Sequence, residues 1–237
     1  MPATDRATTL GELVAEQPAA AELFERLGLD YCCGGRRTLE QACAQRGVDA
    51  ATVAVLLETL SDRSSGAETQ AHDVTRATIA ELCDHIAASH HEPLRRDLGR
   101  IAELLDTVVR VHGGDHPELH DLRRLFASTR AELEQHMEVE EQALFPACRA
   151  LGDEPATAQP APDAGLLALL EDDHAATGAA LTALRELAGG YDAERALCGT
   201  HRALLQALHA FERDMHLHVH EENNVLFPRV RARIGAT

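Results

Sequence analysis

The feature that most constrains this chain is an internal repeat, His-x-x-x-Glu-x-x-x-Leu-Phe-Pro, which occurs twice within long helical tracts. The first copy spans residues 136–146 and the second spans 218–228, and the two match at every fixed position. Residues four apart lie on one face of an α-helix, so the His and Glu of each copy can reach one point. The repeat therefore predicts two related helices that each present an imidazole and a carboxylate from one face.

The sequence contains four long helical tracts, and the two copies of the repeat lie in the second and the fourth of them. Each tract has apolar residues at alternating spacings of four and three, which indicates a single buried stripe. Only 3% of the residues are aromatic and Trp is absent, so the core must consist of Leu, Ala and Val. Gly113-Gly114, a proline-rich stretch at about 155–162 and Gly189-Gly190 provide the connections. This arrangement predicts an all-α, up-down-up-down four-helix bundle, with helices at about 75–112, 117–149, 164–189 and 194–233.

Polar residues replace apolar ones on all four stripes. His91 lies 45 residues before His136 and His174 lies 44 residues before His218, so each motif has a partner His on the preceding helix. An antiparallel hairpin would bring the members of each pair to the same level. A buried Glu is costly unless it is paired or binds a metal ion. The six residues predicted to bind a pair of metal ions are therefore His91, His136, Glu140, His174, His218 and Glu222.

Imidazole and carboxylate ligands without thiolate favour iron or manganese at a carboxylate-bridged pair, with zinc as an alternative. If both Glu residues bridge, positions remain for an oxo or hydroxo bridge and for O2, NO or peroxide. Glu132, one turn before His136, is predicted to orient that imidazole; its alternative role is a carboxylate at the edge of the bundle. His112 and His201, near helix ends, either extend the site or are solvated.

Residues 1–63 predict a small helical N-terminal domain, followed by a linker at 64–74 and by the bundle at 75–237. Proline and glycine residues break the N-terminal region into short helical stretches. Ser64, Ser65 and Gly66 favour a flexible linker. The short helices are expected at about 10–17, 19–27, 39–46 and 51–62.

Two adjacent cysteines, Cys32 and Cys33, precede Gly34 and Gly35, which we expect to give the backbone freedom to present the thiols. The thiols could serve as metal ligands, as a nitrosylation site or as a redox pair; the alternative is a buried pair that helps the domain to pack. A vicinal disulfide is strained and is not assumed. The other cysteines form no C-x-x-C pair and are expected to pack on helices: Cys43, Cys83, Cys148 and Cys198.

The charge of the chain bears on its partners. A formal net charge of -17 would repel phosphate backbones and anionic lipids, because binding to either needs an excess of Lys and Arg. The N-terminus lacks the basic start and apolar run of a signal peptide, and no stretch reaches the roughly 18 apolar residues of a membrane helix. We therefore expect a cytoplasmic protein without nucleic-acid or membrane partners.

Three stretches carry a resemblance to a known family: residues 30–35 (Asp-Tyr-Cys-Cys-Gly-Gly), 136–146, and 222–228 (Glu-Asn-Asn-Val-Leu-Phe-Pro). In these the chain resembles the iron-sulfur cluster repair di-iron proteins, the repair-of-iron-centres branch of the hemerythrin-like families. The resemblance implies two non-haem iron ions on the six residues above, bridged by carboxylates and by an oxo or hydroxo group. It also implies damaged iron-sulfur proteins as clients, a cytoplasmic location and, in many members, a homodimer.

Three functions stand as hypotheses. The resemblance favours a stress-response protein that repairs iron-sulfur clusters damaged by oxidative or nitrosative stress, by supplying iron, with reaction with NO as an additional activity. The first alternative is hemerythrin-like O2 binding or sensing, although oxygen carriers lack the cysteine-containing domain and use a fifth His. The second alternative is a di-iron NO reductase or peroxidase. No catalytic residue is assigned, and whether the protein is an enzyme stays open.

Overall fold

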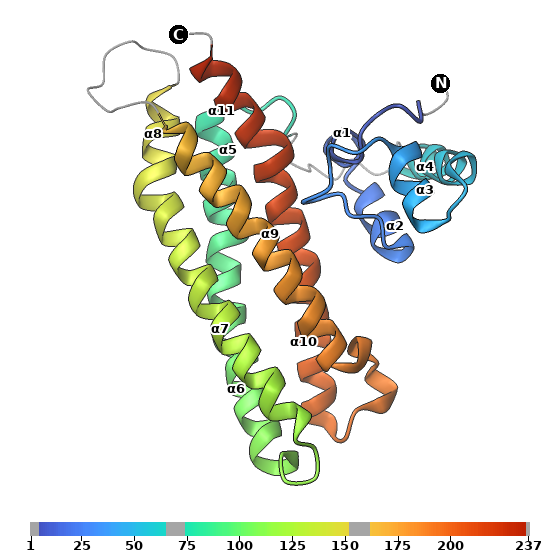
Figure 1. The fold of residues 1–237 in the computed structure, drawn as a ribbon, viewed down its shortest axis with the longest axis vertical. Coiled ribbons are helices and arrows are strands. Elements are labelled where there is room, and N and C mark those ends of the chain that lie inside the picture. Colours follow the sequence, from blue (N-terminus) through green and yellow to red (C-terminus); the bar gives the residue numbers. More distant parts are fainter. Residues whose placement is uncertain (1–4, 65–73, 152–161, 236–237) are drawn as a thin grey trace. The chain divides into compact units, whose positions relative to one another are not determined.

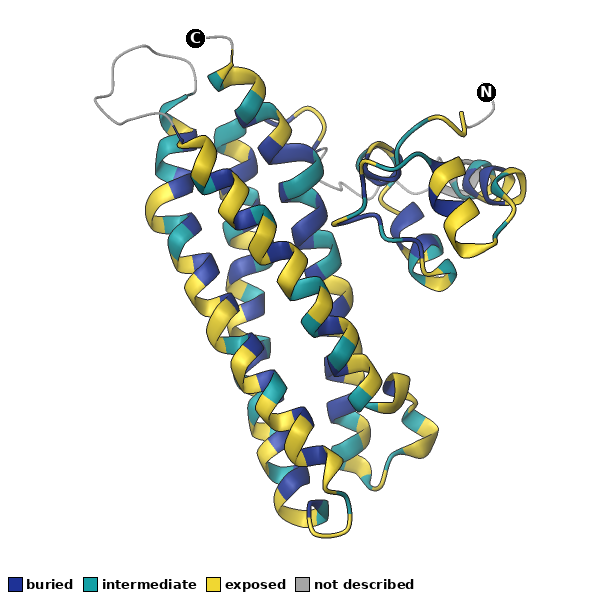
Figure 2. Cartoon of the chain, in the orientation of Figure 1, coloured by how far each residue is buried: buried dark blue, intermediate teal, exposed yellow. Residues whose placement is uncertain are grey.

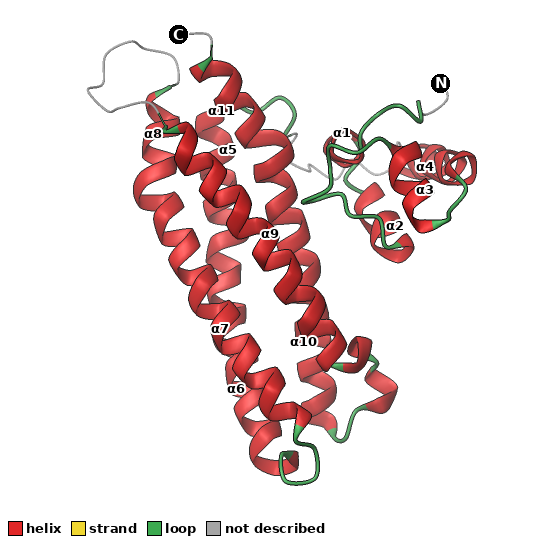
Figure 3. Ribbon diagram, in the orientation of Figure 1, coloured by secondary structure: helices red, strands yellow, loops and turns green. Residues whose placement is uncertain are grey.

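The computed structural model describes residues 5–64, 74–151 and 162–235, and it is helical almost throughout (Figure 1 and Figure 3). Within these ranges the β-type pairing is limited to an isolated bridge between Thr9 and Thr38. The predicted all-α class is therefore confirmed. Residues 65–73 of the predicted linker and residues 152–161 of the proline-rich connection lie outside the described residues. Two compact units are present, residues 1–82 with 217–237, and residues 83–216.

The short helices of the N-terminal region begin and end close to the predicted positions. Thr9 and Thr38 form capping boxes at the starts of the first and third helices, where each hydroxyl accepts a backbone N–H of the first turn. Gly28 and Gly47, with φ of 65° and 68°, end the second and third helices in the left-handed conformation that glycine adopts without strain. The helices are α1 Leu10–Glu16, α2 Ala20–Leu27, α3 Leu39–Arg46 and α4 Ala50–Ser64.

The elements after residue 78 join into four long helical columns, whose course can be followed in Figure 1. The first contains α5, η1 and α6, the second α7, η2 and α8, the third α9, and the fourth α10, η5 and α11. In chain order their bounds are α5 Ile79–Ile86, η1 Ala87–His91, α6 Glu92–His112, α7 Glu118–Val139, η2 Glu140–Leu144, α8 Phe145–Ala150, α9 Ala164–Leu187, α10 Gly199–His220, η5 Glu221–Leu226 and α11 Phe227–Ile234.

Within residues 83–216 these helices pack as a bundle. Helix α7 packs against both α6 and α9. The Phe126 ring of α7 meets the Phe211 ring of α10 edge to face at 5.9 Å, and Arg185 of α9 pairs with Glu212 of α10 at 2.9 Å. Most residues of the predicted apolar stripes are buried, and buried positions recur along each column in Figure 2. The helical bundle predicted from the stripes is therefore confirmed.

The connections differ in length. Gly113 follows directly after α6, and α7 begins five residues later, as the glycine pair predicts. After α9, Gly189 and Gly190 take φ of 63° and 72°, and two short 3-10 segments, η3 Gly189–Tyr191 and η4 Ala193–Arg195, precede α10. Helix α10 therefore begins at residue 199 rather than near 194. The midpoint between His174 and His218 falls inside this longer connection.

Three of the columns contain a π-helical turn, which the sequence analysis did not predict. In η1, η2 and η5 the turn closes through N–H groups that bond to the carbonyl five residues earlier, as Phe145 N–H does to Glu140 O. A proline is the second residue of the α-helix after each turn. Proline has no N–H, and its ring clashes with the carbonyl four residues before it, so the preceding turn widens. These prolines are Pro93, Pro146 and Pro228.

Candidate metal centre and thiol loop

The buried polar side chains of the described residues include all six predicted ligands. None of the six is more than 7% exposed, and His91, Glu140 and Glu222 are fully buried. Desolvation of a carboxylate costs several kcal/mol in order of magnitude unless a cation or hydrogen-bond donors compensate it. The six positions therefore have the burial expected of ligands rather than of surface residues.

Within residues 83–216 the structure brings four of the six together. His91 Nε2 lies 3.3 Å from Glu140 Oε2, while His136 Nε2 lies 3.3 Å from Glu140 Oε1. His174 Nε2 lies 3.0 Å from His136 Nε2. Two nitrogens bound at right angles to one metal ion, at about 2.1 Å each, would be separated by about 3.0 Å. These side chains form a buried His/Glu cluster that could hold a metal ion.

Glu140 occupies the central position of this cluster. Its two carboxylate oxygens face different imidazoles, Oε1 toward His136 and Oε2 toward His91. A carboxylate that bridges two metal ions uses one oxygen for each, and the two ions then bind separate sets of imidazoles. The donor atoms of this part of the chain therefore suit two cations as well as one.

His218 and Glu222 form the corresponding pair on the fourth column. His218 Nε2 lies 3.0 Å from Glu222 Oε1, four residues along the chain, as His136 does from Glu140. Both pairs join the last turns of an α-helix to a π-helical turn. The two copies of the sequence repeat therefore have the same local geometry.

The π-helical turns determine where the predicted ligands project. His91 is the last residue of η1, Glu140 is the first of η2 and Glu222 lies within η5. A π-turn adds one residue to a helical turn and so changes which residues face the core after it. The proline of each Leu-Phe-Pro sequence, and Pro93 after His91, is the sequence signal that could have indicated these turns.

Glu141 contacts one of the six predicted ligands, a contact that was not predicted from the sequence. Its Oε1 lies 2.8 Å from His91 Nδ1, and both of its oxygens accept hydrogen bonds of 2.9 Å from Arg95. Burial would raise the pKa of Glu141, but hydrogen bonds from Arg95 and His91 outweigh it and lower the pKa. An ionised Glu141 holds the His91 proton on Nδ1, which directs Nε2 to Glu140.

The prediction for Glu132 is corrected by the structure. Glu132 is exposed and accepts a hydrogen bond from Ser128 at 2.8 Å. The Nδ1 atom of His136 faces α9 instead, where Asp173 Oδ2 lies at 3.5 Å. A residue one turn earlier projects toward the N-terminal side of its own helix, whereas Asp173 approaches from the neighbouring helix at the level of the imidazole.

His112 and His201 do not extend the cluster. His112 Nε2 lies 3.2 Å from Cys198 Sγ, and the same sulfur accepts the His201 N–H at 3.4 Å. His112 is the last residue of α6, whereas His91 directly precedes that helix of 21 residues. At 1.5 Å per residue the two are roughly 30 Å apart. Cys198 therefore has a histidine contact that sequence reasoning did not anticipate.

The thiol loop, residues 30–35, packs against the C-terminal segment of its own compact unit. Asn224 Nδ2 donates to the backbone oxygens of Tyr31 at 3.2 Å and Cys32 at 3.0 Å. The Tyr31 ring also meets the His220 ring edge to face at 5.7 Å. The loop is thus held by the helical turn that carries Glu222.

The two glycines of the thiol loop provide space rather than an unusual backbone conformation. Neither has a positive φ. A Cβ at Gly35 would lie 2.4 Å from Asn224 Oδ1, and one at Gly34 would overlap the Arg37 guanidinium. The expectation of conformational freedom is therefore corrected: these positions exclude a side chain because their neighbours approach closely.

Comparison with known proteins places these features in a class. A model of the hemerythrin HHE cation binding domain matches residues 84–230, and a model of ScdA_N, a domain of unknown function, matches residues 6–61. The protein is thus a hemerythrin-type cation-binding protein with an N-terminal ScdA_N domain. None of the helices in the described ranges has the length and apolarity needed to cross a bilayer.

The relatives define the family more narrowly. The chain is 31% identical to the iron-sulfur cluster repair protein ScdA of Staphylococcus haemolyticus, over 92% of this chain and 95% of that protein. It is 32% identical to the repair proteins YtfE of Pectobacterium carotovorum, over 94% and 96%, and of Edwardsiella ictaluri, over 95% and 97%. The chain belongs to the ScdA/YtfE family of iron-sulfur cluster repair proteins. The resemblance inferred from the three sequence stretches is confirmed.

Proposed function

We propose that this protein binds two iron ions and supplies iron for the repair of damaged iron-sulfur clusters. The observation that carries the proposal is the fully buried Glu140, whose two oxygens face different imidazoles. The relatives that share nearly the whole chain are named as iron-sulfur cluster repair proteins. The proposed ligands are His91, His136, Glu140, His174, His218 and Glu222.

The part of Glu222 in this centre is proposed from the repeat. Its pair with His218 reproduces that of Glu140 with His136, and it is equally buried. The hemerythrin match at residues 84–230 includes all six ligands. Two bridging carboxylates with four imidazoles would leave positions for an oxo or hydroxo bridge.

The residues of the chain prepare the centre for reversible iron binding. Glu141 holds the proton of His91 on Nδ1, and Asp173 lies beside the Nδ1 atom of His136. The Nε2 atoms of both imidazoles therefore face Glu140. Imidazole and carboxylate bind ferrous iron less tightly than a full set of thiolates would. When bound, the iron pair supplies exchangeable, redox-active ions. This ligand set therefore suits a protein that both holds and gives up iron.

The setting of this activity is also proposed. Damaged iron-sulfur proteins would be the clients, and a cytoplasmic location would place the protein beside them. Reaction with NO and formation of a homodimer stay predictions of the sequence resemblance.

The proposal is tested by reactivation of an enzyme whose iron-sulfur cluster has been damaged by peroxide. Iron-loaded wild-type protein should restore its activity, whereas Glu140→Leu and Glu222→Leu, which remove the proposed bridges, should retain little iron and restore little. Glu134→Leu is the matched control, because Glu134 is exposed on the same helix as His136. If the iron-depleted Glu140→Leu protein repaired the enzyme as well as wild type, the bundle centre would not be the source of the iron.

A further inference from the structure

We propose that Asp30, Cys32 and Cys33 form a second cation site, which takes a divalent first-row transition metal ion such as Fe2+ or Zn2+. The site uses different ligands from the bundle centre, with two thiolates and one carboxylate. Its donor atoms all lie within 4.8 Å of one another. Cys32 is buried and Cys33 is exposed, so the ion would be accessible from solvent on one side.

The separations between the donor atoms suit a tetrahedral ion. Cys32 Sγ lies 3.8 Å from Cys33 Sγ and 3.4 Å from Asp30 Oδ1. With metal–sulfur bonds of about 2.3 Å and a metal–oxygen bond of about 2.0 Å, tetrahedral angles give about 3.8 Å and 3.5 Å for these separations. A disulfide would instead need a sulfur separation of about 2.05 Å. The loop therefore already has the spacing of a three-ligand metal site.

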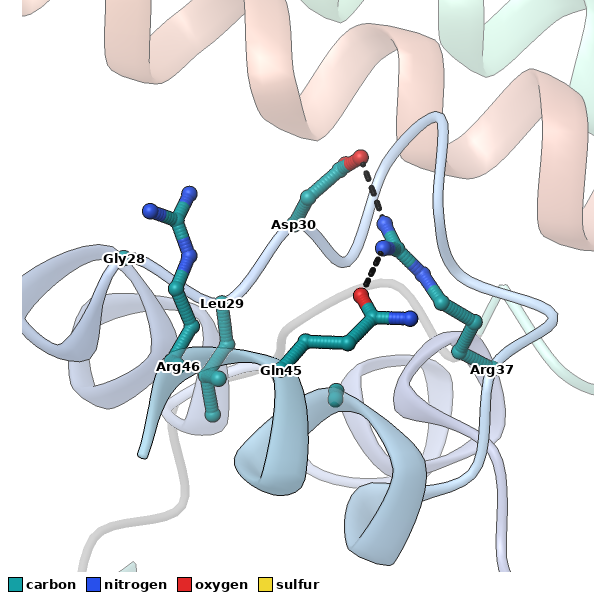
Figure 4. Close-up of a pocket in the computed structure, with 7 residues that line it drawn as sticks. Gly28, Leu29, Asp30, Arg37, Gln45 and Arg46 are labelled. Atoms are coloured by element: carbon teal, nitrogen blue, oxygen red, sulfur yellow. Dashed lines mark hydrogen bonds and ion pairs between the residues drawn. The ribbon is translucent and has the colours of Figure 1, made fainter. Parts of the chain in front are cut away.

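The Asp30 carboxylate is held with one oxygen toward the thiols. Its Oδ2 accepts a hydrogen bond from Arg37 at 3.0 Å, and Arg37 in turn donates to Gln45 at 2.6 Å (Figure 4). Its Oδ1 accepts the Cys33 N–H at 3.1 Å and the Cys32 thiol at 3.4 Å, so loss of the Cys32 proton would leave this oxygen one lone pair for a metal ion. Asp30 and Arg37 also line an open pocket of about 320 Å³. Water from this pocket or from the exposed side of Cys33 could complete the coordination.

The charges of the loop balance when a dication is present. Two thiolates and the Asp30 carboxylate carry three negative charges, which one divalent ion and the Arg37 guanidinium neutralise. A thiol binds a metal ion as the thiolate, so binding of the ion must displace the protons of both thiols to the solvent, and affinity should increase with pH.

The bundle ligands contain no sulfur, which makes the two sites spectroscopically distinct. We would titrate the reduced, metal-free full-length protein with Co2+, without oxygen, and follow the near-ultraviolet thiolate-to-cobalt charge-transfer band together with proton release. The wild-type protein should develop the band, Cys33→Ser should lose it, and Asp30→Asn should weaken binding at least about 10-fold. Glu140→Leu should keep the band, because the thiol loop does not need the bundle ligands.

Cys43→Ala is the matched control, since Cys43 is a buried thiol of the same domain outside the cluster. It should leave the band unchanged, and circular dichroism should show equal helix content in all variants. The proposal fails if the wild-type protein gives no thiolate band. It also fails if folded Cys33→Ser gives the same band as wild type, or if Cys43→Ala abolishes it.

Discussion

Acidic residues that are not fixed positions of the repeat contact the imidazoles of the proposed ligands and orient them. His91 meets Glu141, which is itself fixed by both nitrogens of the Arg95 guanidinium, whereas His136 has a longer contact with Asp173. A carboxylate at Nδ1 fixes the tautomer of a ligating histidine and increases its basicity. The two acids therefore differ in how much they should matter to metal binding.

We expect Glu141→Gln to reduce the metal affinity of the bundle about 10- to 100-fold, because a neutral amide cannot stabilise the His91 proton as well as an ionised carboxylate. Metal titration of the purified protein measures this. Glu134→Gln, an exposed residue of α7 paired with Arg130, should bind as wild type. Wild-type affinity in Glu141→Gln would mean that the contact with His91 has no part in the centre.

A second pair of variants compares Glu132, the acid predicted to orient His136, with Asp173, the acid that contacts His136 in the structure. Asp173→Asn should weaken metal binding by up to about 10-fold, less than Glu141→Gln, because its contact of 3.5 Å is at the limit of hydrogen bonding. Glu132→Gln should have no effect, since Glu132 faces solvent. The same titration decides between them, and the reverse order of effects would contradict the structure.

At the scale of secondary-structure elements, the π-helical turns are the irregular parts of the bundle helices, and they contain three of the six proposed ligands. Proline after each turn prevents the turn from closing as an α-helix, at a cost in helix stability. This loss of helix stability occurs at the three turns from which His91, Glu140 and Glu222 project. Stability and metal binding should therefore respond in opposite directions when one of these prolines is replaced.

We expect Pro146→Ala to stabilise the metal-free protein by about 1–3 kcal/mol, because alanine restores an N–H and removes the ring clash. The same change should weaken metal binding, since the turn that carries Glu140 can close to α-helical geometry. Denaturant unfolding of the metal-free protein and metal titration measure the two effects. Pro117→Ala, at the start of α7 and outside any π-turn, is the control. Lower stability together with unchanged affinity would show that Pro146 does not maintain the turn.

At the scale of the whole molecule, a single asparagine joins sequence-distant parts of one compact unit. Asn224 binds carbonyl oxygens of the thiol loop, and Gly11 and Gly35 leave the space that its side chain fills. Asn224 lies two residues after Glu222. The position of the thiol loop is thus fixed by the same helical turn that carries a proposed metal ligand.

We expect Asn224→Ala to destabilise the protein by about 1–3 kcal/mol, because two buried carbonyls lose their donor, and to increase the rate of Cys33 alkylation. Gly11→Ala should act similarly, since its Cβ would lie 2.8 Å from the Asn224 side chain. In the double variant the added methyl group gains room, so the two costs should be less than additive. Fully additive costs would mean that Gly11 and Asn224 do not interact.

Several features of the fold and the site could be predicted from individual residues. The repeat at His136 and His218 indicated the proposed ligands of both columns, and the prolines and glycines between the short helices gave their bounds within a few residues. The orientation of the imidazoles could not be predicted. Glu141 and Glu132 are both acids near a ligand in sequence, and only the packing of the helices decides which of them reaches an imidazole.

The sequence by itself determined the helical class and the buried stripes and indicated the types of the proposed ligands, because helical periodicity and the cost of burying charge act locally along the chain. The tertiary structure decided which acids contact His91 and His136, how the π-turns present the carboxylates, and that the thiol loop packs against Asn224. These features depend on distances between residues far apart in sequence, and no local pattern specifies such distances.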